Sequence, residues 1–475
     1  MRKYFLFCVT IFMMQYLKAQ EILVRPYLQP GNASQLNEEQ KVLIWQTDSI
    51  PGTFVVSYRM KGEPENSAKT ATAKVSNVKL HLLNKTTFLY RSSLTDLMFD
   101  TSYQYDITLN GKSIANASFD TRTKKPHTRF AVLGDFGAGS PQQSLIAKQI
   151  AKNLPQFVLT TGDNVYPDGL ERDYRNNLFP YYLDPDSIGG KVSSLMNTIP
   201  FYMVLGNHDV RSDNLDSLPD GLAYFYYSDL PLNAPITTRT ISADGRSGVT
   251  KAFKKNTKPR FPRIANFSFD YGNVHFSCLD ANYYVNPLDP QLTQWLKDDI
   301  GTSKADWKIV TFHQPGFNSS RAHYNEQIMR LLSPLMEQLG VDLVLAGHVH
   351  NYQRTVPLKF DPERNKSGDE YVVSPEGKVN GKFQLDMEFD GDRNTSPKGI
   401  VYIITGAGGG QLYNWGETGK PELWKHEPAE NWAPFTTKFI ADIFSFTFIE
   451  TNGKLLTLQQ IDMNGNVLDS IKITK

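Results

Sequence analysis

The chain has 475 residues, with 50 lysines and arginines against 49 aspartates and glutamates, for a formal net charge of +1 at pH 7. This length exceeds one small domain and predicts two or three. The balanced charge provides no electrostatic footprint for nucleic acid or for an anionic membrane surface, so any preference for an anion must come from a local site.

Residues 1–20 have the pattern of a secretory signal peptide. Arg2 and Lys3 precede the apolar stretch 4–14, and Leu17-Lys18-Ala19 follows, with the small residue Ala19 at its end. The apolar run is well short of the roughly 20 residues that cross a bilayer, which argues against an uncleaved anchor. We therefore expect cleavage near Ala19, a secreted or periplasmic protein, and no transmembrane helix after signal removal.

Only one cysteine, Cys278, follows the predicted signal peptide. A lone cysteine excludes intrachain disulfides, so stability must come from core burial and bound metal. We expect Cys278 to be a buried residue of a strand over 274–279.

Residues 21–123 predict an all-β sandwich, because short apolar runs alternate with turn signals such as Asn110-Gly111. The expected strands are 42–47, 53–60, 78–83, 87–94, 103–110 and 117–121. Trp45 on an early strand, with Leu97 and Tyr103 around a turn, resembles the core tryptophan and tyrosine corner of fibronectin type III modules.

The polar segment 122–128 contains a proline and marks the expected boundary to a second domain, residues 124–475. From there the pattern changes to strands that alternate with helices, which is typical of an α/β domain. We expect helices that begin at Pro141 and at Pro290, and a third over 325–339.

Two stretches, near 211–262 and 357–398, are rich in turn-forming residues and have little periodicity. They predict long insertions, and loops of this length usually serve function or are disordered. Both leave strand ends near the candidate site, so we expect them to shape substrate binding. The tail 444–475 predicts strands joined by two Asn-Gly turns.

Five short apolar runs in the second domain each stop at a polar cluster. The clusters are Gly134-Asp135, Gly162-Asp163, Gly206-Asn207-His208-Asp209, His313 and Gly347-His348-Val349-His350. Strands of parallel or mixed sheets place such loops together outside their carboxyl ends. Of nine histidines, His208, His313, His323, His348 and His350 lie in or beside these clusters, whereas we expect His81, His127, His275 and His426 to be structural or solvated. The clusters predict one site for two metals.

The order and spelling of these motifs resemble the calcineurin-like metallophosphoesterase family from about Arg129 to Gly410. Tyr166 follows Asp163 by three residues, similar to the Asp-x-x-Tyr hallmark of purple acid phosphatases. Val165 and Tyr166 also stand where cytosolic-type protein phosphatases have Asp-Arg-Gly, which disfavours that branch. The resemblance implies an αββα domain, in which helices flank two packed mixed sheets.

The resemblance also implies a binuclear centre in which Asp163 bridges both ions. A ferric ion would be held by Asp135, Asp163, Tyr166 and His350, and a divalent zinc, iron or manganese ion by Asp163, Asn207, His313 and His348. A phenolate and two carboxylates are hard, anionic ligands suited to a trivalent ion, and neutral ligands suit a divalent one. The implied activity is an exported acid phosphatase that hydrolyses phosphate monoesters through direct attack by a metal-bound hydroxide.

Two histidines are candidates for substrate contact beside the ligand Asn207. His208 is placed to contact the phosphoryl group, with Asp209 to fix its tautomer. His323 follows His313 by ten residues, as a substrate-side histidine does in the family, and is the candidate acid that protonates the leaving alkoxide. The glycine-rich loop 406–410 lacks the Lys-Ser/Thr of a nucleotide-binding loop, so we expect a tight structural turn rather than a phosphate cradle. Tyr352 and Arg354, just after His350, are candidate pocket residues.

The substrate would be a phosphorylated small molecule or polymer. One alternative keeps the centre but assigns it to a phosphodiesterase or nucleotide pyrophosphatase. Another makes the chain a non-catalytic surface binding protein in which the sandwich adheres to a polymer. Loss of metal ligands would mark the last case, and all expected ligands are present.

Overall fold

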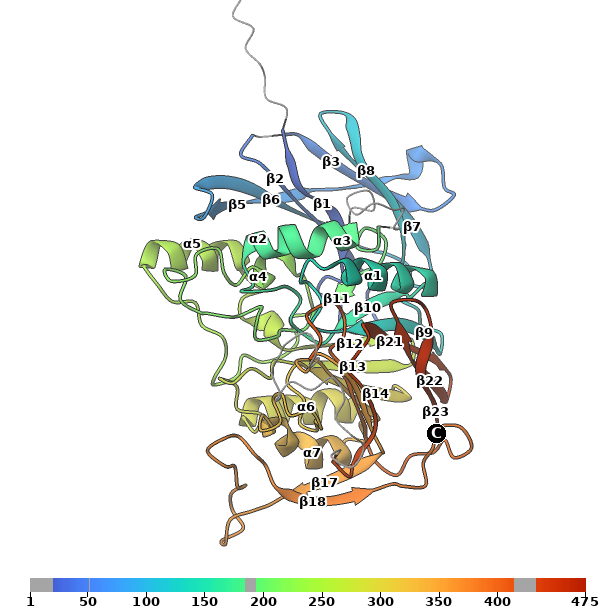
Figure 1. Ribbon diagram of the computed structural model, residues 1–475. Helices are drawn as coiled ribbons and strands as arrows, with labels where there is room; N and C mark the ends of the chain where they lie inside the picture. The colour runs from blue at the N-terminus through green and yellow to red at the C-terminus, as the bar shows by residue number, and fades with distance from the viewer. Residues whose placement is uncertain (1–19, 51, 184–193, 414–432) are drawn as a thin grey trace, which may run out of the picture.

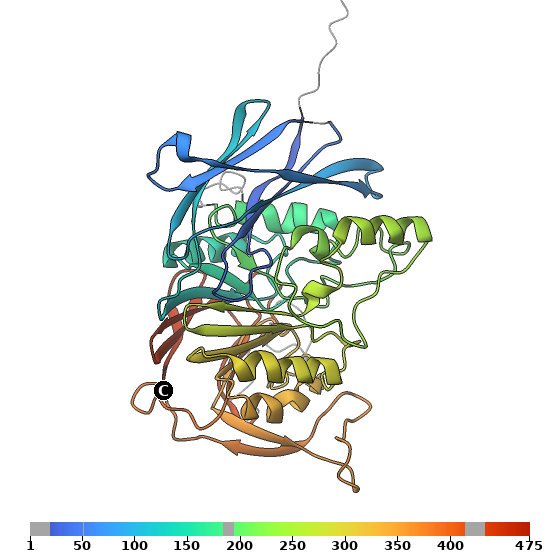
Figure 2. The same cartoon turned by 180° about the vertical axis from the view of Figure 1, so that it is seen from behind.

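The computed structural model describes residues 20–50, 52–183, 194–413 and 433–475. A strand-rich domain lies at one end of the molecule, and a larger domain with two sheets and outer helices forms the rest (Figures 1 and 2). Residues 1–19 of the predicted signal peptide, and His426, lie outside the described residues. Within the described ranges, no helix combines the length and apolarity needed to cross a bilayer.

The N-terminal domain is a sandwich of two four-stranded antiparallel sheets, as predicted. Trp45 is buried and stacks on Tyr90 with ring centroids 5.2 Å apart. The hydroxyl of Tyr103 accepts a hydrogen bond of 3.1 Å from the backbone N–H of Met98, which fixes the predicted corner. In sheet order the strands are β1 Ile22–Gln29, β2 Lys41–Thr47, β6 Lys85–Leu94 and β5 Ala73–Leu80, then β4 Lys69–Ala71, β3 Phe54–Met60, β7 Ser102–Leu109 and β8 Lys112–Asp120.

The second domain contains a six-stranded and a seven-stranded mixed sheet, as the resemblance implied. The six-stranded sheet has the order β11 Phe201–Tyr202, β10 Phe157–Thr160, β9 His127–Leu133, β21 Ser445–Asn452, β22 Leu455–Asp462 and β23 Val467–Thr474. The seven-stranded sheet has the order β12 Phe267–Tyr271, β13 Val274–Leu279, β14 Trp307–Phe312, β15 Leu343–Ala346, β19 Val401–Thr405, β16 Tyr352–Thr355 and β20 Thr436–Ile440.

Aromatic side chains fill the space between these sheets. Phe130 of β9 and Phe276 of β13 meet edge to face with centroids 5.1 Å apart, and Phe157 of β10 lies 5.6 Å from Phe276. Such pairs add to the free energy of burial in a core. Cys278 is buried in β13, as predicted.

Two outer helices, α1 and α6, begin at Pro141 and Pro290 as the sequence predicts. The side chain of Ser140 caps α1 and accepts a hydrogen bond from one backbone N–H group, and the side chain of Asp289 caps α6 and accepts from two. Each helix has proline as its first residue, a position where the missing N–H group costs no hydrogen bond. The helices are α1 Pro141–Asn153, α2 Glu171–Asp173, α3 Phe179–Leu183, α4 Tyr224–Tyr227, α5 Ser247–Thr257, α6 Pro290–Thr302 and α7 Ser333–Gln338, with short turns η1 Glu65–Ser67, η2 Tyr174–Leu178, η3 Arg263–Ala265 and η4 Ile328–Leu332.

The single helix predicted over 325–339 is wrong. The segment divides into the 3-10 turn η4 and the short helix α7, in which Pro334 stands in the first turn. Proline has no N–H and fits only the start of a helix, so the chain before it takes a tighter turn.

Arg122 ties the two domains together although it lies in the polar segment between them. Its side chain is 2% exposed and donates to Glu39 Oε2 at 2.5 Å. It also donates to the backbone carbonyls of Ser34 at 3.1 Å and Asp270 at 3.2 Å, one from each domain. The domains are therefore joined by a buried charged contact and not by the chain alone.

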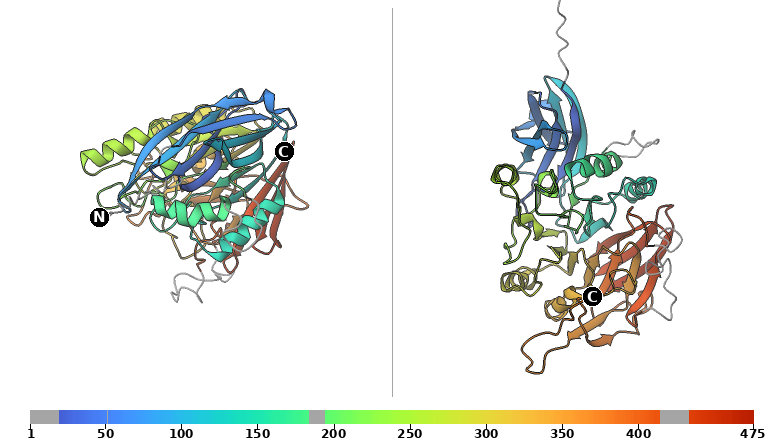
Figure 3. Two further views of the ribbon diagram at one scale, coloured as in Figure 1. Left: turned by 90° about the horizontal axis from the view of Figure 1, so that it is seen from above. Right: turned by 60° about the vertical axis from the view of Figure 1, so that its left-hand side comes forward.

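The two insertions occupy different places (Figure 3). Residues 211–262 carry α4 and α5 and contact the sandwich, because the carboxylate of Asp220 accepts from the backbone N–H groups of His81 and Leu82 at 2.7 and 3.0 Å. Residues 357–398 carry the hairpin of β17 Leu358–Pro362 and β18 Gly381–Leu385.

Candidate metal centre

The predicted strand ends meet at one edge of the domain. β9 and β10 are parallel neighbours in one sheet, as are β14 and β15 in the other. The loops after these strands carry Asp135, Asp163, His313 and His348. Asp135, Asp163 and His348 have φ values of 58°, 50° and 68°, a left-handed conformation that non-glycine residues adopt rarely and often at functional sites.

One group of side chains surrounds the hydroxyl of Tyr166. This hydroxyl lies 3.1 Å from Asp135 Oδ1, 3.2 Å from Asp163 Oδ2 and 2.9 Å from His350 Nε2. His350 Nε2 is also 3.4 Å from Asp135 Oδ1. The group contains the four residues expected to hold the first metal.

A second group surrounds Nε2 of His313. This nitrogen lies 3.0 Å from Asn207 Oδ1, 3.3 Å from Asp163 Oδ2 and 3.2 Å from His348 Nδ1. Ligand atoms of Asp163, His313 and His348 all lie within 4.8 Å of one another, close enough to share one ion. Asp163 contacts both groups, so the structure brings all seven predicted side chains together with Asp163 between the two halves.

The tautomers of two histidines fit a bound cation. Nδ1 of His313 lies 2.8 Å from the carbonyl of Thr161, and Nδ1 of His350 lies 2.5 Å from the carbonyl of Gln411. Each Nδ1 must therefore carry the proton that it donates, which leaves a lone pair on each Nε2 in the neutral ring. Nε2 of His313 faces Asp163 and the Asn207 amide oxygen, and Nε2 of His350 faces Asp135 and the Tyr166 hydroxyl. Burial alone would lower the pKa of both rings, but the carboxylates of Asp163 and Asp135 outweigh it, raising the pKa of His313 to about 9 and that of His350 above its usual value. Each Nε2 therefore binds a proton when no metal is bound, and a metal cation would take the place of that proton.

The third histidine, His348, is held the other way round. Its Nε2 lies 2.8 Å from Glu326 Oε2, and burial lowers the pKa of His348 to about 4. The neutral ring therefore donates from Nε2 to Glu326 and presents its Nδ1 lone pair to the second group. This donor set fits the metal pair that the sequence predicts.

Tyr166 is protonated unless a cation is near. Burial and the carboxylates of Asp135 and Asp163 raise the pKa of its phenol well above the usual value. Ionisation to a phenolate ligand therefore requires positive charge among these oxygens.

Two glycines allow the groups to approach. A Cβ atom at Gly162 would lie 2.5 Å from Nδ1 of His313, and one at Gly206 would collide with Asp163. Gly162 also has a φ of 95°, which favours glycine. These glycines explain the Gly-Asp and Gly-Asn spelling of the motifs.

His208 lies beside the carboxylate of Asp163. Its Nδ1 is 2.5 Å from the carbonyl of Pro167, so Nε2 faces the site, 4.0 Å from Asp163 Oδ2. The expectation that Asp209 fixes its tautomer is wrong. Asp209 accepts from the backbone N–H of Gly206 at 2.9 Å and the side chain of Asn164 at 2.8 Å, and so holds the loop instead.

His323 reaches the same site through two residues that sequence reasoning missed. Its Nδ1 lies 2.6 Å from Glu326 Oε1, and its Nε2 lies 3.0 Å from the hydroxyl of Tyr413. The ring of Tyr413 stacks on His350 with centroids 4.4 Å apart. Glu326 could have been found by its position three residues after His323, whereas no local pattern marks Tyr413.

The glycine-rich loop 406–410 is a packed turn, as expected. The N–H groups of Gly406, Gly408 and Gly410 donate to the carbonyls of Asn351, Gly134 and Asp135. These amides therefore hold the loop against the strand ends and are already occupied.

Tyr352 and Arg354 do not line the site, contrary to expectation. Both are buried and contact Asp469 on β23, at 2.8 Å from the Tyr352 hydroxyl and 2.6 Å from Arg354 Nε. Alternate residues of β16 point to the same face, so both reach this carboxylate.

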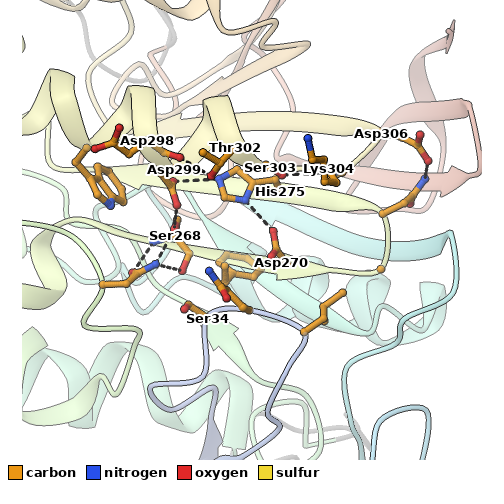
Figure 4. Close-up of a pocket in the computed structure, with 18 residues that line it drawn as sticks. Ser34, Ser268, Asp270, His275, Asp298, Asp299, Thr302, Ser303, Lys304 and Asp306 are labelled. Atoms are coloured by element: carbon orange, nitrogen blue, oxygen red, sulfur yellow. Dashed lines mark hydrogen bonds and ion pairs between the residues drawn. The ribbon is translucent and has the colours of Figure 1, made fainter.

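A cavity of about 670 Å³ lies elsewhere, between α6, β12 and the sandwich (Figure 4). His275 lies in its wall with Nδ1 2.7 Å from Asp270 and Nε2 3.0 Å from Asp299. Asp299 accepts from Ser268 and Ser277 as well. These groups satisfy one another, which agrees with a structural role for His275.

Residues 128–352 match the family model described as calcineurin-like phosphoesterase. Purple acid phosphatase 21 of Arabidopsis thaliana is 24% identical over 358 residues, which cover 74% of this chain and 71% of that protein. Fe(3+)-Zn(2+) purple acid phosphatase 12 of the same plant is 26% identical, over 66% of this chain and 61% of that protein.

Among solved structures, the purple acid phosphatase PPD1 from yellow lupin (Lupinus luteus) seeds superposes with a TM-score of 0.60 at 16% identity. The superposition covers 94% of this chain and 74% of that one, so the fold is shared along nearly the whole described length. Residues 128–352 therefore form a calcineurin-like phosphoesterase domain, and the chain as a whole is similar to the purple acid phosphatases.

Proposed function

We propose that this protein is an acid phosphatase that hydrolyses phosphate monoesters at a binuclear metal centre. The observation that carries the proposal is the position of Asp163, whose carboxylate lies 3.2 Å from the Tyr166 hydroxyl and 3.3 Å from His313 Nε2. A carboxylate between two complete sets of ligands is what a pair of ions needs.

The two sets of ligands favour different metal ions. The first set contains a phenol and two carboxylates, Tyr166, Asp135 and Asp163, and suits Fe(III). The second adds neutral Asn207, His313 and His348 to the shared carboxylate and suits a divalent Zn, Fe or Mn ion. The relative named Fe(3+)-Zn(2+) purple acid phosphatase 12 supports this pairing.

When bound, such an ion pair supplies Lewis acidity that polarises the phosphoryl group and makes water a nucleophile without a covalent enzyme intermediate. The residues of the chain bind and orient the ester. Asn207 and His208 face the phosphoryl position from the loop after β11, and His208 is 27% exposed at its side chain and thus accessible to substrate.

His323 provides the proton for the leaving group. Its Nδ1 donates to Glu326, and its Nε2 is held near the Tyr413 hydroxyl at the open side of the centre. An alkoxide is a poor leaving group unless it is protonated as the P–O bond breaks, so an acid at this place accelerates hydrolysis of alkyl esters.

Phosphodiester or nucleotide pyrophosphate cleavage by the same centre is the first alternative. Rates on an aryl phosphate and on a bis-aryl phosphate separate the two: a monoesterase prefers the former, whereas a diesterase prefers the latter. A non-catalytic surface binding protein would hydrolyse neither while it held both metals.

The central experiment is the visible absorption spectrum of the mature protein with its metal content, beside the variant Tyr166→Phe and the control Tyr413→Phe. We expect a tyrosinate-to-iron band that Tyr166→Phe loses and Tyr413→Phe keeps. A colourless wild type with two metals would remove the ferric assignment and favour the diesterase. Failure to hold metal after reconstitution would overturn the catalytic proposal.

We also propose export with cleavage near Ala19, supported by the charged, apolar and small-residue zones of 1–20. Domain limits of 21–123 and 124–475 belong to the same proposal. N-terminal sequencing of protein recovered outside the cytoplasm tests the cleavage site, and an intact Met1 would contradict it.

A further inference from the structure

A second cavity, about 430 Å³, is lined by residues of the first insertion and of the loop after β13. One wall begins at Val210, two residues after His208, so their Cα atoms are at most about 7.6 Å apart. The opposite wall contains Tyr283 and Tyr284 from the loop after β13.

The register of the sheet places that loop next to a metal ligand. Leu279 of β13 pairs with Phe312 of β14, the residue before His313. The side chain of Gln314 donates to Asn282 Oδ1 at 3.3 Å across the same edge. The cavity therefore lies between the segment that follows His208 and the loop after β13, the strand that neighbours the one ending just before His313.

Tyr283 is held in an exposed position by its neighbours. Asp280 accepts from the backbone N–H and side chain of Asn282 at 3.0 and 2.8 Å, and from the hydroxyl of Tyr284 at 2.8 Å. The residues on both sides of Tyr283 are thus anchored, yet its own side chain is 92% exposed. A large aromatic ring held in water by a fixed loop is a ready surface for stacking.

Arg239 gives the cavity a positive group. Its side chain is exposed and forms no ion pair within the described ranges. Asp213 also lines the cavity and accepts from the hydroxyl of Ser242 at 2.6 Å, so the attraction for an anion is local to Arg239. An unpaired guanidinium on a cavity wall attracts an anionic group of a ligand.

We propose that this cavity is the leaving-group pocket of the phosphatase, and that it selects aromatic leaving groups that carry a second negative charge. The aromatic ring stacks on Tyr283 and the anion faces Arg239 while the phosphoryl group lies at the centre. This inference rests on the proposed function, because it assigns the leaving group of the same reaction.

The experiment compares benzyl phosphate with cyclohexylmethyl phosphate, which are both alkyl esters of similar size but differ in aromatic character. Tyr283→Ala should raise KM for benzyl phosphate about fivefold with little change in kcat, and should leave KM for the cyclohexyl ester nearly unchanged. Tyr283→Phe keeps a ring and should retain the wild-type preference. Calorimetric binding of the two matching phosphonates should give the same order without turnover.

Arg239 is tested with 4-carboxybenzyl phosphate. Arg239→Ala should raise KM for this ester about threefold and leave benzyl phosphate unchanged. Arg246→Ala is the matched control, since that arginine lies in the same insertion but pairs with Asp216 at 2.9 Å.

These experiments distinguish a failure of the pocket proposal from a failure of the proposed function. A metal-loaded wild type that hydrolyses every monoester but shows equal KM and equal phosphonate binding for the two rings, with no effect of Tyr283→Ala, overturns the pocket alone. A metal-loaded wild type that hydrolyses none of the esters overturns the proposed function, and the pocket with it.

Discussion

Glu326 joins the candidate metal ligand His348 to the candidate acid His323. One carboxylate oxygen lies 2.8 Å from His348 Nε2 and the other 2.6 Å from His323 Nδ1. Burial would raise the pKa of this carboxyl, but its hydrogen bonds to both histidines outweigh that effect and lower it, so Glu326 is ionised. A single side chain thus orients a candidate metal ligand and a candidate proton donor.

Loss of this carboxylate should affect both partners. We expect Glu326→Ala to lower the affinity for the divalent metal or the activity by about 10- to 100-fold, as loss of a hydrogen-bond partner of a ligand typically does. A metal titration measures the affinity, and steady-state kinetics measure kcat. For both quantities, the value for Glu326→Gln should lie between those of Glu326→Ala and the wild type. Glu388→Gln, on an exposed ion pair with Lys398, is the control. Equal metal affinity and equal kcat in the wild type, Glu326→Ala and Glu326→Gln would show that Glu326 does not orient the two histidines.

His323 should matter most for poor leaving groups. We expect His323→Ala to reduce kcat for an alkyl phosphate by about 10²- to 10⁴-fold and to reduce it much less for 4-nitrophenyl phosphate, whose leaving group needs no proton. His208→Ala, which alters phosphoryl contact, should slow both substrates alike. Equal losses on both substrates for His323→Ala would contradict the acid role.

His275 should make the stability depend on pH. Burial alone would lower the pKa of His275, but hydrogen bonds to Asp270 and Asp299 outweigh it and raise the pKa to about 9. Because the folded pKa exceeds the unfolded value near 6.5, the stabilisation is complete below about pH 6.5 and is lost as the pH rises through 9.

We therefore expect His275→Gln to lower the free energy of unfolding by about 3 kcal/mol at pH 6 and by much less near pH 10. Urea unfolding at both pH values measures the difference. His127→Gln is the control, because His127 pairs with Glu450 on the surface with 49% of its side chain exposed. A destabilisation that does not change with pH would show that His275 is not charged in the folded protein.

Arg122 should contribute to stability more than a surface arginine does. Arg122→Ala leaves buried Glu39 with Lys41 as its charged partner, but it removes the charged hydrogen bonds that Arg122 donates to Glu39 and to four backbone carbonyls, so we expect a loss of about 3–5 kcal/mol. Arg172→Ala, at a half-exposed pair with Asp173, should cost less than about 1 kcal/mol. Similar unfolding midpoints for both variants would exclude a special role for the interdomain contact.

Local patterns in the sequence were sufficient for much of the fold. The alternation of apolar residues predicted the sandwich, and the Ser-Pro and Asp-Pro pairs predicted the starts of α1 and α6. The helix predicted over 325–339 was wrong, because the spacing of apolar residues does not show that a new helix begins at Pro334.

By itself, the sequence determined which residue types stand at the strand ends and therefore the metal chemistry that they favour. Only the tertiary structure decided which residues hydrogen-bond to these side chains. Glu326 contacts His348, Tyr413 contacts His323 and Pro167 contacts His208, whereas Asp209 contacts Asn164 and not His208. The physical reason is how far apart the interacting residues lie in the sequence. A ligand next to a strand end is a local property of the chain, whereas a hydrogen bond across 22 or 90 residues depends on how the loops pack.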